Sequence, residues 1–159
     1  MGIDKDFSRA LYKAMVASNM DAPVGGKLIA TIADQHKHEA VDIIREFTEV
    51  GYEVFATEGT ALFLNQNGVK AKLVKKMGEK DGTTLLDLII NNEVDLLINT
   101  ASKDKKIEQE AAVIRKTSVQ KSIPCITSLD TAKALLFALR SKQRGEKPEC
   151  MTIDSYMNI

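Results

Sequence analysis

Polar side chains, either small, cationic or amide-bearing, end each of the short β-type runs in this sequence, and the sharpest example is Thr57-Glu58-Gly59-Thr60. This segment lies where a predicted strand turns into a helix. Hydroxyls and free N–H groups at such a turn bind anions, and a glycine lets the backbone approach closely. We therefore predict a phosphate site here. A simple helix cap at Thr60 beside a turn at Gly59 is the alternative.

Other strand ends add groups that suit the same ligand. Lys37 follows the first predicted strand, Lys76 follows the third, and Asn99 ends the fourth. The two lysines are placed to neutralise a phosphate, while the amide offers a donor and an acceptor to a base or sugar. In open parallel sheets such segments converge, because ligands bind beyond the carboxyl ends of the strands. The convergence of two lysines and an amide therefore strengthens the prediction of a phosphate site.

Competing chemistries have weaker support. His36 and His38 are two residues apart at a helix start, so their side chains diverge, and no ligand spacing completes a metal site. Asp34 is a candidate catalytic carboxylate, but a helix start is also where aspartate caps. Cys125 and Cys150 lack metal-type spacing, and we expect Cys125 to be a buried small hydrophobe in a reducing compartment.

Apolar periodicity indicates the elements that position these residues. Short β-type runs alternate with amphipathic helical ones, which favours a parallel sheet with helices on both faces. We predict an α/β, three-layer αβα fold with five parallel strands. The expected strands are 27–33, 53–56, 71–75, 95–99 and 125–127, and the expected helices are 6–18, 38–50, 60–67, 85–91, 105–122 and 130–141, with a Gly-punctuated loop at 77–83.

Length and charge restrict the function. A chain of 159 residues fits one domain, and 22 basic against 22 acidic residues leave no net charge. Duplex nucleic acid and anionic membrane surfaces are disfavoured, because both attract basic excess. No apolar run is long enough to cross a bilayer and no signal peptide is visible, so we expect a cytoplasmic protein.

Several segments, read in order, resemble the methylglyoxal-synthase-like domain at the carboxyl end of the carbamoyl-phosphate synthase large chain. Each piece is weak alone, but the ordered set is specific. The resemblance runs from about Phe7 to the last helix and implies a methylglyoxal-synthase-like (Rossmann/flavodoxin-like) fold. The matching segments are Ala10–Met15, Thr31–Asp34, Gly51–Ala61, Leu73–Lys76, Leu97–Thr100, Val113–Lys116 and Ser128–Ala132.

The resemblance implies a regulatory module rather than a catalyst. Residues 1–26 would be a helix and connector from the preceding synthetase unit, residues 27–142 the regulatory domain, and residues 143–159 a tail with a short docked segment. The domain would bind UMP, or IMP in some members. The partners would be the synthetase domains of the same parent chain and a glutaminase small chain, and self-association stays open. No cofactor is expected in this domain, whereas ATP with Mg or Mn is implied for the parent enzyme of pyrimidine and arginine synthesis.

Site residues carried over by motif are the phosphate and sugar contacts Thr31, Lys37, Thr57, Gly59, Thr60, Lys76, Asn99 and Thr100. Thr127 falls near a second effector site for ornithine, and Arg115 is a candidate for that site or for a domain interface. At two positions the sequence differs from the pattern common in the family. Ala101 stands in place of a hydroxyl residue, and Ile126 stands in place of a polar one. Members that sense N-acetylglutamate carry an aromatic residue in place of Lys76, so the lysine favours a nucleotide.

Methylglyoxal synthase itself, a lyase acting on dihydroxyacetone phosphate, is the alternative. Its chemistry needs a carboxylate base and histidines to move protons. Ala33 stands where its histidine would be, the segment Met77–Lys80 lacks its Gly-Gly-Asp sequence, and Thr100–Lys103 lacks its aspartate. We therefore expect no such turnover.

Overall fold

Five parallel strands form the centre of the molecule. The computed structural model describes residues 1–18, 20–76, 82–146 and 151–157. The sheet order is β3-β2-β1-β4-β5. The strands are β1 (Gly26–Thr31), β2 (Tyr52–Ala56), β3 (Ala71–Leu73), β4 (Leu96–Asn99) and β5 (Cys125–Ile126). The expected five-stranded parallel sheet is confirmed.

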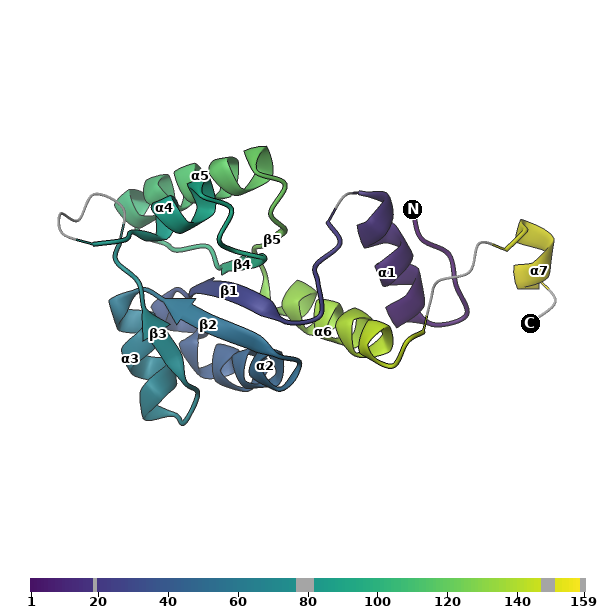
Figure 1. The fold of residues 1–159 in the computed structure, drawn as a ribbon, viewed down its shortest axis with the longest axis horizontal. Coiled ribbons are helices and arrows are strands. Elements are labelled where there is room, and N and C mark those ends of the chain that lie inside the picture. Colours follow the sequence, from purple (N-terminus) through teal and green to yellow (C-terminus); the bar gives the residue numbers. More distant parts are fainter. Residues whose placement is uncertain (19, 77–81, 147–150, 158–159) are drawn as a thin grey trace.

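Helices cover both faces of this sheet, so the expected three-layer architecture is also confirmed (Figure 1). One face carries α2 (Lys37–Glu49), α3 (Glu58–Gln66) and α6 (Leu129–Gln143), and the other carries α4 (Leu85–Ile90) and α5 (Lys105–Gln120). A short 3-10 helix, η1 (Asp34–His36), precedes α2. No helix in the described part of the chain is long and apolar enough to span a membrane.

The central strands are buried on both sides, as parallel strands between helical layers usually are. In β1, Leu28, Ile29 and Ala30 are all fully buried, and every residue of β4 is buried. In α2, the apolar residues Ala40, Ile44 and Phe47 recur at helical spacing and pack into the core on one side of the sheet. Burial of these apolar residues holds the parallel strands side by side, so their carboxyl ends meet at one edge of the sheet.

Element boundaries differ from the expected ones by a few residues. The first strand stops at Thr31 rather than Ala33, because the Ala33 N–H donates to the Thr100 side chain instead of a neighbouring strand. The second of the sheet-flanking helices begins at Glu58, so Thr57 and not Thr60 is its N-cap residue. The loop predicted at 77–83 and Cys150 fall wholly or partly outside the described residues.

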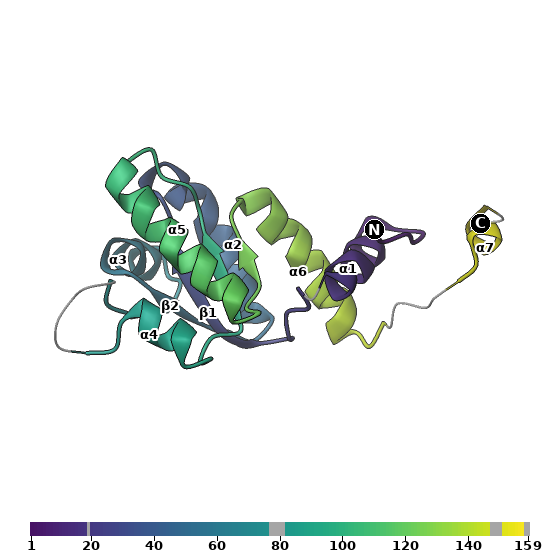
Figure 2. The same ribbon diagram turned by 90° about the horizontal axis from the view of Figure 1, so that it is seen from above.

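Segments at both ends of the chain lie beyond the sheet. Helix α1 (Phe7–Ala17) begins after its N-cap Asp6 and packs on α6, away from the strands (Figures 1 and 2). The tail carries α7 (Ile153–Met157), and the Lys13 ammonium donates to the Tyr156 hydroxyl at 2.7 Å. These contacts tie the tail to the N-terminal helix rather than to the sheet.

The strand order reverses direction between β1 and β4. The chain runs outward through β2 and β3 and then returns to place β4 on the other side of β1. Loops that leave β1 and β4 therefore diverge, which opens a crevice at their carboxyl ends. In the register of this pair, Thr31 lies opposite Asn99. Two of the predicted site residues thus face each other at the switch point.

Candidate functional site

A cleft of about 420 Å³ opens at this switch point. That volume lies within the range of small-molecule sites. All eight residues predicted as phosphate and sugar contacts line it. The full lining is Thr31, Ile32, Ala33, Asp34, Lys37, Thr57, Gly59, Thr60, Lys76, Asn99, Thr100, Ser102, Ile107 and Ala111.

Two threonine hydroxyls form one wall and are oriented by their neighbours. Asn99 Nδ2 donates to Thr31 Oγ1 at 2.6 Å, and the Ala33 N–H donates to Thr100 Oγ1 at 2.8 Å. Within the described part of the chain, neither hydroxyl donates to a protein acceptor. A hydroxyl that already accepts keeps its hydrogen for another partner. Both are therefore placed to donate to oxygen atoms of a ligand.

The opposite wall is the start of α3. The first N–H groups of a helix have no partner within the helix, and they attract anions together with the helix dipole. Thr57 lies at the N-cap position with an extended backbone, and no side-chain cap bond is formed there. An anion at this end would therefore meet free N–H groups next to the Thr57 hydroxyl.

Thr60 has a different role from the one expected of a ligand contact. Its side chain is only 4% exposed, and its hydroxyl lies 3.3 Å from Ile32 N and 3.4 Å from Ile32 O. The hydroxyl accepts from the Ile32 N–H and donates to the Ile32 carbonyl oxygen, so it joins the start of α3 to the residue that follows β1. Thr60 thus shapes the turn, while its hydroxyl is engaged by the protein.

Lys37 reaches into the cleft from the start of α2. Its ammonium lies 2.7 Å from Asp34 Oδ1 and 2.9 Å from the Gly59 carbonyl oxygen, and its side chain is 15% exposed. A Cβ placed on Gly59 would lie 3.3 Å from this nitrogen. Such contact is tighter than usual, so a glycine at this position gives the ammonium room beside the turn.

Lys76 and Lys75 diverge after β3. Lys76 is exposed and lines the cleft. The Lys75 side chain lies instead near Gly82, where an added Cβ would be 3.4 Å from Lys75 Cε. Adjacent residues on an extended segment point to opposite sides, which accounts for the difference. Only Lys76 of this pair joins Lys37 in the cleft.

A second layer behind the cleft holds the Asn99 amide. Arg115 donates to Asn99 Oδ1 at 2.8 Å and also pairs with Glu108, which accepts from the Ser102 N–H at 3.1 Å. The Arg115 hydrogen bond lowers the pKa of the Glu108 carboxyl below its usual value. Arg115 therefore fixes which end of the amide faces Thr31.

This second layer was not identified from the sequence, where Arg115 was a candidate for a second effector site or an interface. The structure places Arg115 behind the main cleft. Thr127 is exposed after β5 and does not line that cleft. A seven-residue separation sets Glu108 and Arg115 on one face of a helix, and that spacing is the signal that could have found the pair.

The two histidines point to different neighbours. His36 Nε2 lies 3.0 Å from Gln35 Nε2, and the His38 ring packs edge-on against Phe63. Among the residues that the structure describes, no three His, Cys, Asp or Glu side chains gather in a way that could hold a metal ion.

Proton-transfer chemistry also finds little support in the cleft. Asp34 is the one carboxylate among the described lining residues, and no histidine lines it. A hydrogen bond from Lys37, and then the charges of Lys37 and Lys76, lower the pKa of the Asp34 carboxyl. A carboxylate with a lowered pKa is a weak base. The segment Met77–Lys80, where methylglyoxal synthase differs from this sequence, lies outside the described residues.

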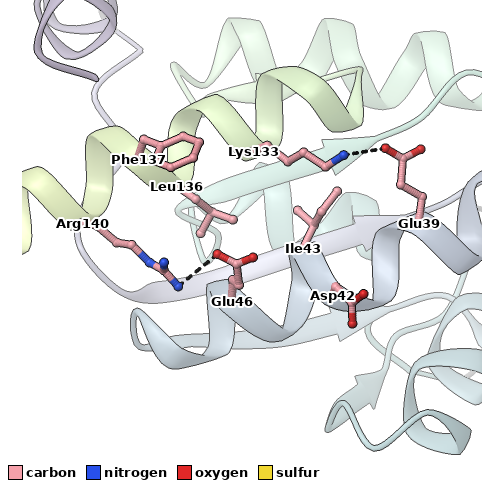
Figure 3. Close-up of a pocket in the computed structure, with 8 residues that line it drawn as sticks. All are labelled: Glu39, Asp42, Ile43, Glu46, Lys133, Leu136, Phe137 and Arg140. Atoms are coloured by element: carbon pink, nitrogen blue, oxygen red, sulfur yellow. Dashed lines mark hydrogen bonds and ion pairs between the residues drawn. The ribbon is translucent and has the colours of Figure 1, made fainter. Parts of the chain in front are cut away.

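Another cleft, of about 300 Å³, lies between α2 and α6 (Figure 3). Ion pairs cross it from Lys133 to Glu39 at 2.8 Å and from Arg140 to Glu46 at 3.0 Å. Its floor is apolar, with the buried residues Ile43 and Leu136. Four of its charged side chains are thus paired across the two helices. Among its described lining residues there is no helix start like that of α3 at the switch point.

Comparison with known proteins indicates the family to which this chain belongs. A carbamoyl phosphate synthase large chain from Lachnoclostridium phytofermentans is 40% identical over 146 residues, which are 92% of this chain and 14% of that protein. A protein from Methanocaldococcus jannaschii, named carbamoyl phosphate synthase large chain, C-terminal section, is 40% identical over the same length, 92% of this chain and 24% of that protein. This chain thus spans a small part of both relatives. The family model of the MGS-like domain matches residues 39–127, from α2 to the end of β5, and the chain belongs to the MGS-like domain family.

Proposed function

We propose that this chain is the allosteric regulatory domain of a carbamoyl-phosphate synthase large chain and that it binds a nucleoside monophosphate in the switch-point cleft. The observation that carries the proposal is the convergence of two lysines, a free helix start and two donor hydroxyls in one cleft. The relatives' names supply the parent enzyme, and UMP or IMP are the effectors that the resemblance implies.

The phosphate would bind at the start of α3. Backbone N–H groups after Thr57 and the ammonium groups of Lys37 and Lys76 all favour negative charge at that end of the cleft. The lysines approach from α2 and from the end of β3, so they would hold the anion from two sides.

The sugar and base would extend along β1 and β4. Thr31 and Thr100 offer hydroxyl donors there, and Asn99 keeps one further N–H and one further lone pair beyond its protein contacts. Ile107 and Ala111 of α5 add an apolar wall beside them. Mixed polar and apolar lining of this kind suits a nucleoside better than a bare anion.

Regulation would follow from coupling to the rest of the parent protein. An effector changes activity only if it binds one state of the whole enzyme better, typically by about 1–3 kcal/mol. The synthetase domains of the parent chain and a glutaminase small chain would be the partners, with ATP and Mg or Mn acting in the synthetase domains. The pathway would be pyrimidine and arginine synthesis in the cytoplasm.

Calorimetric titration of this chain with UMP, IMP and N-acetylglutamate tests the proposal. We expect saturable binding of a nucleotide, weaker binding of the matching nucleoside, and no binding of N-acetylglutamate. Incubation with dihydroxyacetone phosphate is the parallel assay, and methylglyoxal above background would show a lyase instead. Binding of N-acetylglutamate without either nucleotide would disprove the assignment.

A further inference from the structure

The Asp34 carboxylate is an anionic group of the protein itself that lines the cleft. Its carboxylate lies 2.7 Å from the Lys37 ammonium, and the charge of Lys76 acts on it as well. These are the two lysines that the proposed function assigns to the ligand's phosphate. The protein therefore already partly neutralises the charges on which the phosphate would depend.

In the part of the chain that the structure describes, Lys37 is the hydrogen-bond partner that holds the Asp34 carboxylate in this position. The Asp34 side chain is 94% exposed, whereas that of Lys37 is 15% exposed. Asp34 begins the short, three-residue helix η1. An exposed carboxylate can turn into solvent at small cost, because exposed ion pairs are weak. The lysine, by contrast, stays anchored to the Gly59 carbonyl oxygen.

We propose that Asp34 is an internal competitor of the ligand's phosphate, holding the Lys37 ammonium in the free protein and releasing it when a doubly charged anion binds. This inference rests on the proposed function, since it concerns the same cleft. It assigns Asp34 a specificity-determining role rather than a capping or catalytic one.

Competition of this kind discriminates between classes of ligand. A free carboxylate offers Lys37 the same group as Asp34, which is tethered three residues away at a high effective concentration. A phosphate monoester brings more charge and more acceptor oxygens, and it can also accept from the start of α3. Asp34 would therefore disfavour carboxylate effectors more than phosphate esters.

Binding of sulfate to three single variants and one double variant tests the proposal, with NMR shifts of the Gly59 amide as the readout. Sulfate is a suitable probe because it stays doubly charged while the carboxylate titrates. We expect Asp34→Asn to tighten binding by up to about fivefold, the limit for an exposed ion pair. Glu39→Gln removes the same charge from the pair with Lys133 in the other cleft, and it should change binding much less. In a Lys37→Met background, Asp34→Asn should give no gain.

A second readout follows the carboxylate itself. In the free protein the Lys37 hydrogen bond holds the pKa of Asp34 below its usual value. Saturation with sulfate should raise that pKa, because the ammonium turns to the ligand. Carboxyl NMR measures this directly and does not depend on a change in affinity.

The outcomes separate this inference from the proposed function. If Lys37→Met weakens sulfate binding but Asp34→Asn leaves it unchanged or weaker, the competitor role is wrong and the cleft assignment stands. Equal gains in Asp34→Asn and Glu39→Gln would show a net-charge effect only and would also refute competition. If the pKa of Asp34 stays low with sulfate bound, the pair persists and the inference fails. Absence of binding in every variant would overturn both.

Discussion

Replacement of Lys76 by methionine, with Lys75→Met as its control, is the sharpest test of the cleft. The two residues are neighbours after β3 and carry the same charge, but only Lys76 lines the cleft. Both substitutions change the net charge equally and keep an unbranched side chain. Any difference in nucleotide affinity between them therefore reports position rather than charge.

The expected loss of binding free energy in Lys76→Met follows from the exposure of the Lys76 side chain. A charge-assisted hydrogen bond contributes about 1.5–3 kcal/mol when it is shielded from water, and much less when it is exposed. Lys76 is exposed at the mouth of the cleft, so we expect about 1–1.5 kcal/mol. At 1.4 kcal/mol per tenfold, Lys76→Met should weaken UMP binding by about five- to tenfold.

Isothermal calorimetry at low and moderate salt gives the comparison. Lys75→Met should stay within about twofold of the unmodified chain, since the remaining effect is a screened long-range one. Thermal unfolding should move little in either variant, because neither side chain belongs to the core. Equal weakening by both substitutions, vanishing together as salt rises, would refute the specific contact.

Three further predictions concern residues around the cleft. Thr60→Val should lower the free energy of unfolding in urea by about 1–2 kcal/mol, because two buried backbone groups lose their partner; Thr60→Ser, which keeps the hydroxyl, should lose less. Burial raises the pKa of the Cys125 thiol to about 11, so in a Cys150→Ser background it should react slowly with a thiol reagent at pH 8 and faster as the pH approaches that value; rapid labelling of the folded chain would contradict this. Arg115→Met should weaken UMP binding and lower the melting temperature only slightly, because its main effect is to free the Asn99 amide to turn. A lower melting temperature with unchanged UMP affinity would show a purely structural contact.

Residues at strand ends were predictable from the sequence because their position depends on local pattern. The alternation of short and long apolar runs predicts parallel strands, and the end of each run marks the edge where ligands bind. Thr31 and Asn99 were both placed this way, and the register of β1 with β4 sets them opposite each other. Strand position, together with the motifs of the family that the sequence resembles, located the eight predicted contacts, but not Ser102, Ile107 and Ala111, which also line the cleft.

The partners of these residues were not predictable, because they depend on the packing of distant elements. Nothing in the sequence near Thr60 indicates that its hydroxyl bonds the backbone of Ile32, the residue after β1, rather than a ligand. Arg115 likewise reaches Asn99 only because α5 packs beside β4. Sequence patterns therefore locate the cleft but do not tell which side chains face the ligand and which hold the others in place.

The net charge of the whole chain differs from the charge balance within the cleft. The chain carries 22 basic and 22 acidic residues, so its net charge predicts no attraction to anions. Within the cleft, however, Lys37 and Lys76 face one carboxylate, Asp34, and the Arg115 charge behind them is balanced by Glu108. Counted over the described residues, the local excess is thus a single positive charge next to the start of α3. A small excess of this kind cannot bind a long polyanion, whose affinity grows with each phosphate neutralised, but it suits one phosphate group held by oriented donors.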